Sequence, residues 1–588
     1  MITKMPFWMW QEIMQSLGVN DLDKIKQSIS NKINELVGGD INIEELLEKP
    51  KVASMGDVAF PCFRLAGIYH KSPMDIAADL GEKLKSELPF GVSKIEVVGG
   101  YINFFADSSY ICKTVLTDIL TKKEDYLKSD IGNGKTICID YSSPNIAKPF
   151  HIGHLRTTII GASLYKLYKA LGYNTVGINH LGDFGTQFGY VIEGYKRWKD
   201  EYDLTTNPIG SLVDIYVRIN ALAKEDESIQ EAARHNFMLL EKGDKEVVEL
   251  WSKFRELSLK EYKRIYERLG VEFDSYNGEA FYNDKMQEVV DILKQKGVLK
   301  ESNGAMVVDV ENEQVPCMIL KSNGSTTYAT RDLAAVLYRT REYDFTKCLY
   351  VTGGEQALHF RQVFSTAKYI VGEEKASGLY HIPFGMVLGP DGKKFSTRKG
   401  AKATIEGVLD EAVDRAKEVL IEKGKALDVD KTAEIIGKGA IIFNDLKNNR
   451  IKDEVFDLDD MLKFEGETGP YVMYTYVRTK SILEKAGGVP ELNMVDFENI
   501  KEESEIELVK ELARAKKVLL EAADEFEPSV ITRYTLSLAG AFSKFYNDCQ
   551  VMVEDEKLKN ARLALVYATS IVIKETLGLL GIDCPEKM

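Results

Sequence analysis

Apolar residues in the first hundred positions follow two spacings, which together predict a small α+β unit. Apolar positions recur at helical spacing over 25–36, behind Asn20 or Asp21, either of which can cap a helix. A second helical pattern follows Pro73. The unit closes with a strand-like apolar stretch at 95–106.

Strand and helix patterns alternate after a Gly-Asn-Gly turn signal at 132–134. A helical pattern at 155–171 separates the first two of the predicted strands. Four short apolar segments predict strands: 136–142, 174–180, 348–354 and 384–389. Because strand–helix–strand alternation is typical of parallel sheets with crossover helices, we expect such a sheet here.

Two other stretches are mainly helical. The first, at about 190–299, is highly charged and interrupts the alternation, so we interpret it as an insertion. The second runs from about 427 to the end of the sequence. The predicted fold class is α/β: a Rossmann-type parallel-sheet domain at 130–426, an N-terminal α+β domain at 20–108, and an all-α domain at 427–588.

The composition is that of a globular protein without membrane spans. Of 588 residues 44% are hydrophobic and 28% charged, and no run of about 18 apolar residues occurs. A short apolar patch at 5–10 lacks a following cleavage motif, so we expect no signal peptide. Seven cysteines without C-x-x-C spacing predict neither disulfides nor a structural metal site, which fits a cytoplasmic location.

The formal net charge of −15 disfavours a nucleic-acid partner only if the charge is spread evenly. One short segment sets five cations against a single acid, Asp391: Lys393, Lys394, Arg398, Lys399 and Lys402. A charge run is usually a solvated face, and this one gains meaning only from the motifs around it.

One glycine–lysine–threonine triplet imitates a P-loop but does not fit the motif. The first glycine that a P-loop needs, five positions before Gly134, is Ser129. In addition, Lys135 enters a strand, whereas a P-loop lysine opens a helix. We therefore interpret residues 134–136 as a turn.

The segment at 142–154 has the chemistry of a phosphate-binding site. It joins the carboxyl end of a predicted strand to a helix N-terminus, where free N–H groups and the helix dipole favour an anion. Gly153 allows a ligand to approach the backbone closely. His151 and His154 are three residues apart, so they can share one face and donate hydrogen bonds to phosphate oxygens.

These residues resemble a known family. His-Ile-Gly-His after a first strand is similar to the signature of class I aminoacyl-tRNA synthetases. The longer string SSPNIAKPFHIGHLR, with INHLGDFGTQFG at 178–189, resembles the arginine-specific members, and the resemblance extends from about residue 20 to the end. It implies ATP-dependent ligation of L-arginine to tRNA(Arg) through arginyl-adenylate, with release of AMP and pyrophosphate. It also implies Mg²⁺ bound to ATP as substrate, and a monomer.

The second class signature, K-M-S-K-S, has a degenerate counterpart in Lys-Phe-Ser-Thr-Arg at 394–398. The second lysine is missing, and in arginine enzymes Lys148 is thought to compensate. The resemblance therefore implies four catalytic residues: His151, His154, Lys148 and Lys394. It implies four further ATP contacts: Pro144, Gly153, Ser396 and Arg398. Which cation of this loop touches pyrophosphate stays open.

A pocket for a guanidinium needs carboxylates and flat acceptors. The resemblance implies five arginine-binding residues: Asn145, Glu279, Tyr328, Asp332 and Gln356. From the residues alone, Asp332 could equally cap the following helix and Tyr328 could be part of a core.

The helical C-terminal region offers aromatic side chains for unpaired bases. Pro470 suits a first helical turn, and Tyr471, Tyr474 and Arg478 then share one face, on which bases can stack. For an isolated helix, such a stripe is more often core. The resemblance to an anticodon-binding domain, and to an N-terminal domain touching the tRNA elbow, implies four tRNA contacts: Asn103, Tyr471, Tyr474 and Met588.

Three alternative functions are weighed against this one. A cysteine-specific or glutamate-specific relative is disfavoured by the arginine-type string, and the cysteine enzyme also by the absence of zinc ligands in the sequence. An RNA-binding scaffold without catalysis would not need both histidines and Lys148. A nucleotidyltransferase that acts on another acid would have no use for the helical C-terminal domain.

Overall fold

The computed structural model describes residues 21–38, 41–50, 52, 55–146, 148, 150–389, 391–393, 404–424 and 428–588. No helix within these residues is both long and apolar enough to span a lipid bilayer. The cysteines are free thiols, and all but Cys584 are buried.

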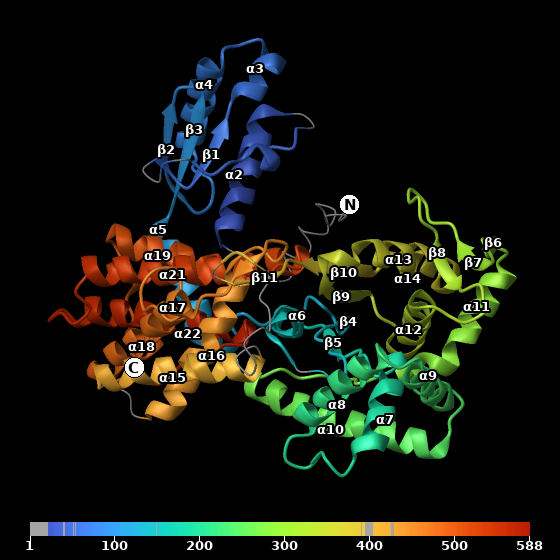
Figure 1. The fold of residues 1–588 in the computed structure, drawn as a ribbon. Coiled ribbons are helices and arrows are strands. Elements are labelled where there is room, and N and C mark those ends of the chain that lie inside the picture. Colours follow the sequence, from blue (N-terminus) through green and yellow to red (C-terminus); the bar gives the residue numbers. More distant parts are fainter. Residues whose placement is uncertain are drawn as a thin grey trace.

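The N-terminal unit is a three-stranded antiparallel sheet packed with helices, and it stands off from the remaining structure (Figure 1). The strand order is β1-β3-β2. The predicted stretch at 95–106 belongs to a hairpin of two strands, which turns at Gly99 with φ 58°. The elements are α2 (Asp21–Val37), β1 (Val58–Pro61), α3 (Phe63–Tyr69), α4 (Pro73–Ser86), β2 (Val92–Val98) and β3 (Tyr101–Ala106).

The central sheet has four strands, all parallel, in the order β10-β9-β4-β5. The strands are β4 (Thr136–Asp140), β5 (Asn174–Ile178), β9 (Lys347–Gly353) and β10 (Leu379–Phe384). The chain leaves β4 towards β5 on one side and later adds β9 and β10 on the other. The order of connection therefore reverses between β4 and β9, where open α/β sheets form ligand sites at the carboxyl ends of the strands. The helices α6 (Ile152–Ala170), α12 (Tyr328–Tyr343), α13 (Ala357–Val371) and α14 (Glu373–Ser377) accompany this sheet.

The prediction that residues 384–389 form a strand of the central sheet is wrong. The sheet strand is β10, an edge strand that carries Pro383 and alternates too weakly for the apolar pattern to reveal it. Beyond Gly385, the chain forms the short strand β11 (Val387–Leu388), which pairs in parallel with β12 (Glu454–Val455) from the C-terminal region. A Cβ on Gly385 would lie 2.5 Å from the carbonyl oxygen of Lys452, so glycine is required at this approach.

The region predicted as a helical insertion is helical through residue 295. Its elements are α7 (Thr186–Trp198), α8 (Pro208–Ala223), α9 (Glu227–Glu241), α10 (Lys245–Leu269), η4 (Glu279–Lys285) and α11 (Met286–Gln295). A small antiparallel sheet that the sequence patterns did not predict follows: β6 (Lys300–Ser302), β7 (Ala305–Val308) and β8 (Cys317–Leu320).

The C-terminal region is helical, as predicted, apart from the two residues of β12. The helices are α15 (Ile405–Lys423), α16 (Val429–Lys447), α17 (Leu458–Met461), α18 (Gly469–Lys485), α19 (Glu503–Ala513), α20 (Ala515–Asp524), α21 (Ser529–Asp548) and α22 (Glu556–Leu579). The helix α5 (Ser108–Lys122), which links the N-terminal unit to the sheet, packs against α19 and α22. Pro470 lies in the first turn of α18, as expected.

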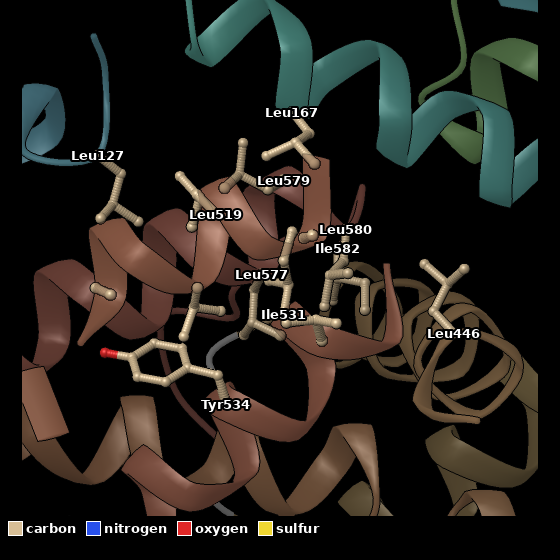
Figure 2. Packing of buried hydrophobic residues seen from close by; sticks show 14 of the residues in the cluster. Leu127, Leu167, Leu446, Leu519, Ile531, Tyr534, Leu577, Leu579, Leu580 and Ile582 are labelled. Atoms are coloured by element: carbon tan, nitrogen blue, oxygen red, sulfur yellow. The ribbon is translucent and has the colours of Figure 1, made fainter. Parts of the chain in front are cut away.

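One hydrophobic core runs from the central sheet into the C-terminal helices. Figure 2 shows Leu167 of α6 beside Leu579 of α22, with Leu446 of α16 and Ile531 of α21 in the same buried cluster. The hydroxyl of Tyr168, on α6, donates to the carbonyl of Ala523 at 2.6 Å. The domain with the central sheet and the C-terminal helical region therefore share buried contacts rather than meeting at a solvated hinge.

Candidate active site

A cavity of about 670 Å³ opens at the carboxyl ends of β4 and β9, beside the N-terminus of α6. It lies where the order of the strands reverses. Eight of the residues predicted from the sequence line it: Asn145, His151, Gly153, His154, Glu279, Tyr328, Asp332 and Gln356. Residues of the phosphate-type motif and residues expected to bind arginine therefore line the same cavity.

The chain leaves β4 through a strained turn on the cavity wall. Ser142 and Ser143 have φ values of 68° and 44°, in the left-handed region that non-glycine residues rarely adopt. The hydroxyl of Thr157 accepts from the Ser142 N–H at 3.1 Å and donates to the Val351 carbonyl at 2.6 Å. The Ser143 hydroxyl donates to Asp140 at 2.9 Å. Hydrogen bonds from three elements thus hold this turn.

The two histidines of the signature cap α6 with their Nδ1 atoms. Nδ1 of His151 accepts from the Gly153 N–H at 3.1 Å, and Nδ1 of His154 accepts from the His151 N–H at 3.3 Å. Burial, with the charges of His151 and Lys148, lowers the pKa of His154 to about 3. His154 is therefore neutral, and because its Nδ1 is an acceptor its proton lies on Nε2. The two rings, 3.9 Å apart, form a pair of donors at a helix N-terminus.

Pro144 and Lys148 lie next to the cavity rather than in its lining. The Pro144 carbonyl accepts from the Gly182 N–H at 3.1 Å, and the Lys148 side chain is exposed. Tyr262, on α10, places its hydroxyl 2.8 Å from the carbonyl oxygens of both Asn145 and Lys148. The backbone that carries Lys148 is thus fixed, while its side chain extends into solvent.

The remaining predicted phosphate contacts, Lys394, Ser396 and Arg398, lie outside the described residues. The described flanks of that loop lie close to the signature histidines. Met386 and Val387 line the cavity before the loop, and Thr404 after it forms a β-bridge with His151.

The cavity lining also carries acidic side chains, among them Glu279 and Asp332. Glu279 lies 3.3 Å from the guanidinium of Arg331, and burial, only partly offset by this cation, raises the pKa of Glu279 to about 7. Asp332 accepts a 2.6 Å hydrogen bond from Nε2 of His359. Tyr328 is 65% exposed at the start of α12, and Gln356 is exposed in the short helix after β9. This set of acceptors suits a planar cation.

An ion pair beneath the cavity was not predicted from the sequence. Arg339, 1% exposed, donates to Asp140 at 2.7 Å, while Asp140 also lines the cavity. Arg339 follows Asp332 by seven residues, so the two side chains lie on one face of α12. This helical spacing is the signal in the sequence that could have identified Arg339.

A second buried arginine, Arg156, connects three parts of the chain. From α6 it donates to the carbonyls of Met386 and Lys452, at 3.3 and 2.8 Å, and lies 3.0 Å from Asp445 of α16. Burial raises the pKa of Asp445 to about 7 despite this arginine. The signal in the sequence is that Arg156 is the one Lys, Arg, Asp or Glu between Ile152 and Tyr165.

Comparisons with known proteins identify the family. Three family models match: "tRNA synthetases class I (R), catalytic domain" over 115–458, "Arginyl tRNA synthetase N terminal domain" over 23–106, and "DALR anticodon binding domain" over 472–588. A curated arginine–tRNA ligase of Clostridium perfringens is 48% identical over 567 residues, covering 96% of this chain and 100% of that protein. This chain belongs to the arginyl-tRNA synthetase family.

Solved structures of arginyl-tRNA synthetases have the same fold. The enzyme of Plasmodium falciparum has a TM-score of 0.79 at 26% identity, covering 96% of this chain and 99% of that one. The Thermus thermophilus enzyme, at 23% identity, has the same TM-score and coverage and supports the fold alone. The resemblance and the fold class predicted from the sequence are confirmed.

In this arginyl-tRNA synthetase, the region matched by the anticodon-binding model carries an aromatic surface. Tyr474 is 38% exposed, and the Arg478 guanidinium lies 4.9 Å from its ring centre and 5.2 Å from that of Tyr546. Tyr471 is partly buried, with its hydroxyl 3.2 Å from that of Ser543. The predicted stripe is thus partly buried at Tyr471 and exposed at Tyr474. Tyr546 belongs to α21, which is distant in sequence but packs against α18, and it was not predicted.

The other two predicted tRNA contacts are more deeply placed. Met588 is buried against the C-terminal helices, and Asn103 is 4% exposed within β3. Within the described part of the chain, no group of three or more His, Cys, Asp or Glu side chains is arranged to hold a metal ion.

Proposed function

We propose that this chain ligates L-arginine to tRNA(Arg) in two steps that share the cavity at β4 and β9. The arginine carboxylate first attacks the α-phosphorus of ATP, and pyrophosphate leaves with its Mg²⁺. The terminal ribose hydroxyl of the tRNA then attacks the arginyl carbonyl carbon, and AMP leaves. One observation carries the proposal: the two imidazoles that cap the N-terminus of α6 and the carboxylates of Glu279 and Asp332 line one cavity.

The phosphate chemistry is assigned to the His151–His154 corner. Phosphoryl-type transfer depends on positioning and on stabilising charge rather than on covalent help from the protein. The Nε2–H groups donate to phosphate oxygens, the Gly153 backbone permits their approach, and Lys148 supplies positive charge as pyrophosphate departs. Lys394, Ser396 and Arg398 add contacts from the loop, and Pro144 holds the turn beneath.

Arginine is assigned to the opposite wall. Asp332 and Glu279 receive the guanidinium, Gln356 and Asn145 accept or donate hydrogen bonds at its two ends, and Tyr328 forms an aromatic side. The Asn145 side chain is fixed because Gly182 lies against it: a Cβ there would lie 2.2 Å from Asn145 Oδ1. A planar cation that satisfies two carboxylates is retained in preference to the compact, strongly hydrated point charge of lysine.

The tRNA is assigned to the ends of the molecule. Tyr474, with Arg478 and Tyr546 beside it, offers stacking surfaces for unpaired anticodon bases, and Tyr471 and Met588 shape the same region. The N-terminal unit with Asn103 contacts the tRNA elbow. The working domain limits are 20–108, 130–426 and 427–588, and we further propose a cytoplasmic monomer.

The test is ATP–pyrophosphate exchange measured with each amino acid, with and without tRNA(Arg). We expect exchange with arginine alone, and only when tRNA is present. Exchange with another amino acid would refute the specificity. Exchange with arginine in the absence of tRNA would leave the specificity standing but contradict the tRNA requirement.

A further inference from the structure

The carboxylate assigned to the substrate guanidinium already has a cationic partner from the protein. Nε2 of His359, in the first turn of α13, lies 2.6 Å from Oδ2 of Asp332, in the second turn of α12, and both side chains line the cavity. A guanidinium that grips a carboxylate through two parallel N–H bonds requires both oxygens. His359 holds one of them.

We propose that His359 pairs with Asp332 while the pocket is empty, and that arginine replaces this imidazolium with its own guanidinium, so that binding releases the proton of His359. The inference rests on the proposed function, because it takes Asp332 as the site of the guanidinium. The step is balanced: an imidazolium–carboxylate pair and an arginine cation become a guanidinium–carboxylate pair, a neutral imidazole and a proton in water.

The protonation state of His359 in the empty pocket supports this exchange. Burial acts to lower the pKa of His359, yet the hydrogen bond and the charge of Asp332 hold it above its ordinary value. Burial likewise acts to raise the pKa of Asp332, while His359, His180 and Arg339 hold it below its ordinary value. Once a guanidinium takes the carboxylate, only burial and a nearby cation act on His359, and both favour loss of its proton.

The surroundings provide a route for the proton and one competing titration. The side chains of His359 and Asp332 are 31% and 27% exposed, so water reaches the pair. The charged groups that face the pair are Arg331 and Arg339 from α12, His180 after β5, Glu355 before α13, and Glu279. Arginine guanidiniums keep their charge in this pH range, and burial lowers the pKa of His180. Glu279, with its pKa of about 7, would also release a proton to water when arginine binds. Its contribution to the proton count must therefore be separated experimentally.

The experiment is calorimetric titration of arginine into the full chain between pH 6 and 8, with a non-hydrolysable ATP analogue and tRNA(Arg) transcript omitted and then included. Each titration is run in two buffers of different ionisation enthalpy, which gives the number of protons released. Wild type and His359→Gln are compared, with Glu279→Gln as a control that removes the competing titration together with one carboxylate assigned to the guanidinium. Histidine-selective ¹³C NMR of the wild type follows the His359 ring directly.

At pH values below the pKa of His359 in the empty pocket, we expect wild type to release up to about one more proton per bound arginine than His359→Gln. Glu279→Gln should keep that difference, and the His359 ring signal should move to its neutral position on adding arginine. Equal release by wild type and His359→Gln, or a ring that stays charged in the complex, overturns the proposal: the imidazole would then hold Asp332 throughout. If arginine gives no binding heat even with the ATP analogue and tRNA, the proposed function fails instead.

Discussion

Tyr262→Phe tests whether the insertion helix α10 positions the ATP site. The hydroxyl lies 2.8 Å from the carbonyl oxygens of Asn145 and Lys148, and the ring is buried. Its removal deletes one hydrogen bond and leaves buried acceptors without their donor, a cost of about 1–3 kcal/mol. If that cost falls on the conformation that presents Lys148, turnover in ATP–pyrophosphate exchange should drop about 5- to 150-fold, at 1.36 kcal/mol per tenfold change.

Tyr534→Phe is the matched control for this change. Tyr534 is also buried, and its hydroxyl donates to the Glu511 carbonyl at 3.0 Å, far from the cavity. Both variants should lose a similar amount of stability in urea unfolding, but only Tyr262→Phe should lose turnover. If Tyr262→Phe is destabilised yet keeps turnover within twofold of wild type, α10 does not position the site.

Three further changes test the assigned roles. Lys148→Ala should lower the turnover number of exchange far more than it raises the KM for ATP, because its charge matters most as pyrophosphate leaves; an unchanged turnover number would remove Lys148 from the mechanism. The pKa of Glu279 is raised to about 7 in the folded chain, so its ionised form opposes folding, and the free energy of unfolding of wild type should fall as the pH rises between about 5 and 8. Glu279→Gln should flatten this pH dependence in urea unfolding. An equal slope in both proteins would contradict the raised pKa. Tyr474→Ala should raise the KM for tRNA by about 5- to 150-fold, from about 1–3 kcal/mol of lost stacking, while ATP affinity stays constant; an unchanged KM would show that no base stacks there.

Local motifs made much of the site predictable, because their chemistry lies within one short segment. The strand, turn and helix around His151 and His154 follow each other in sequence, so spacing alone places them at the carboxyl end of β4. Glu279, Asp332 and Gln356 come from separate elements, and only the resemblance to a family brought them together before the fold was known.

What the sequence hid depends on long-range partners. His359 and Arg339 acquire their roles from Asp332 and Asp140, which they meet only after α12 and α13 pack on the sheet. Strand β10 was missed because an edge strand needs no strict alternation. The strand expected at 384–389 contains β11, and its pairing outside the central sheet was not predicted because its partner, β12, lies more than sixty residues further along the chain. Strands of three or four residues, as in β6–β8, are too short for a period to appear.

The central claim is that the two histidine Nε2 atoms receive the phosphates of ATP while the acidic wall receives arginine. A crystal structure of the full chain with arginine and a non-hydrolysable ATP analogue tests it most directly. We predict phosphate oxygens within hydrogen-bonding distance of Nε2 of His151 and His154, with the guanidinium on Asp332. A nucleotide bound elsewhere, with the corner at the start of α6 empty, would contradict the account.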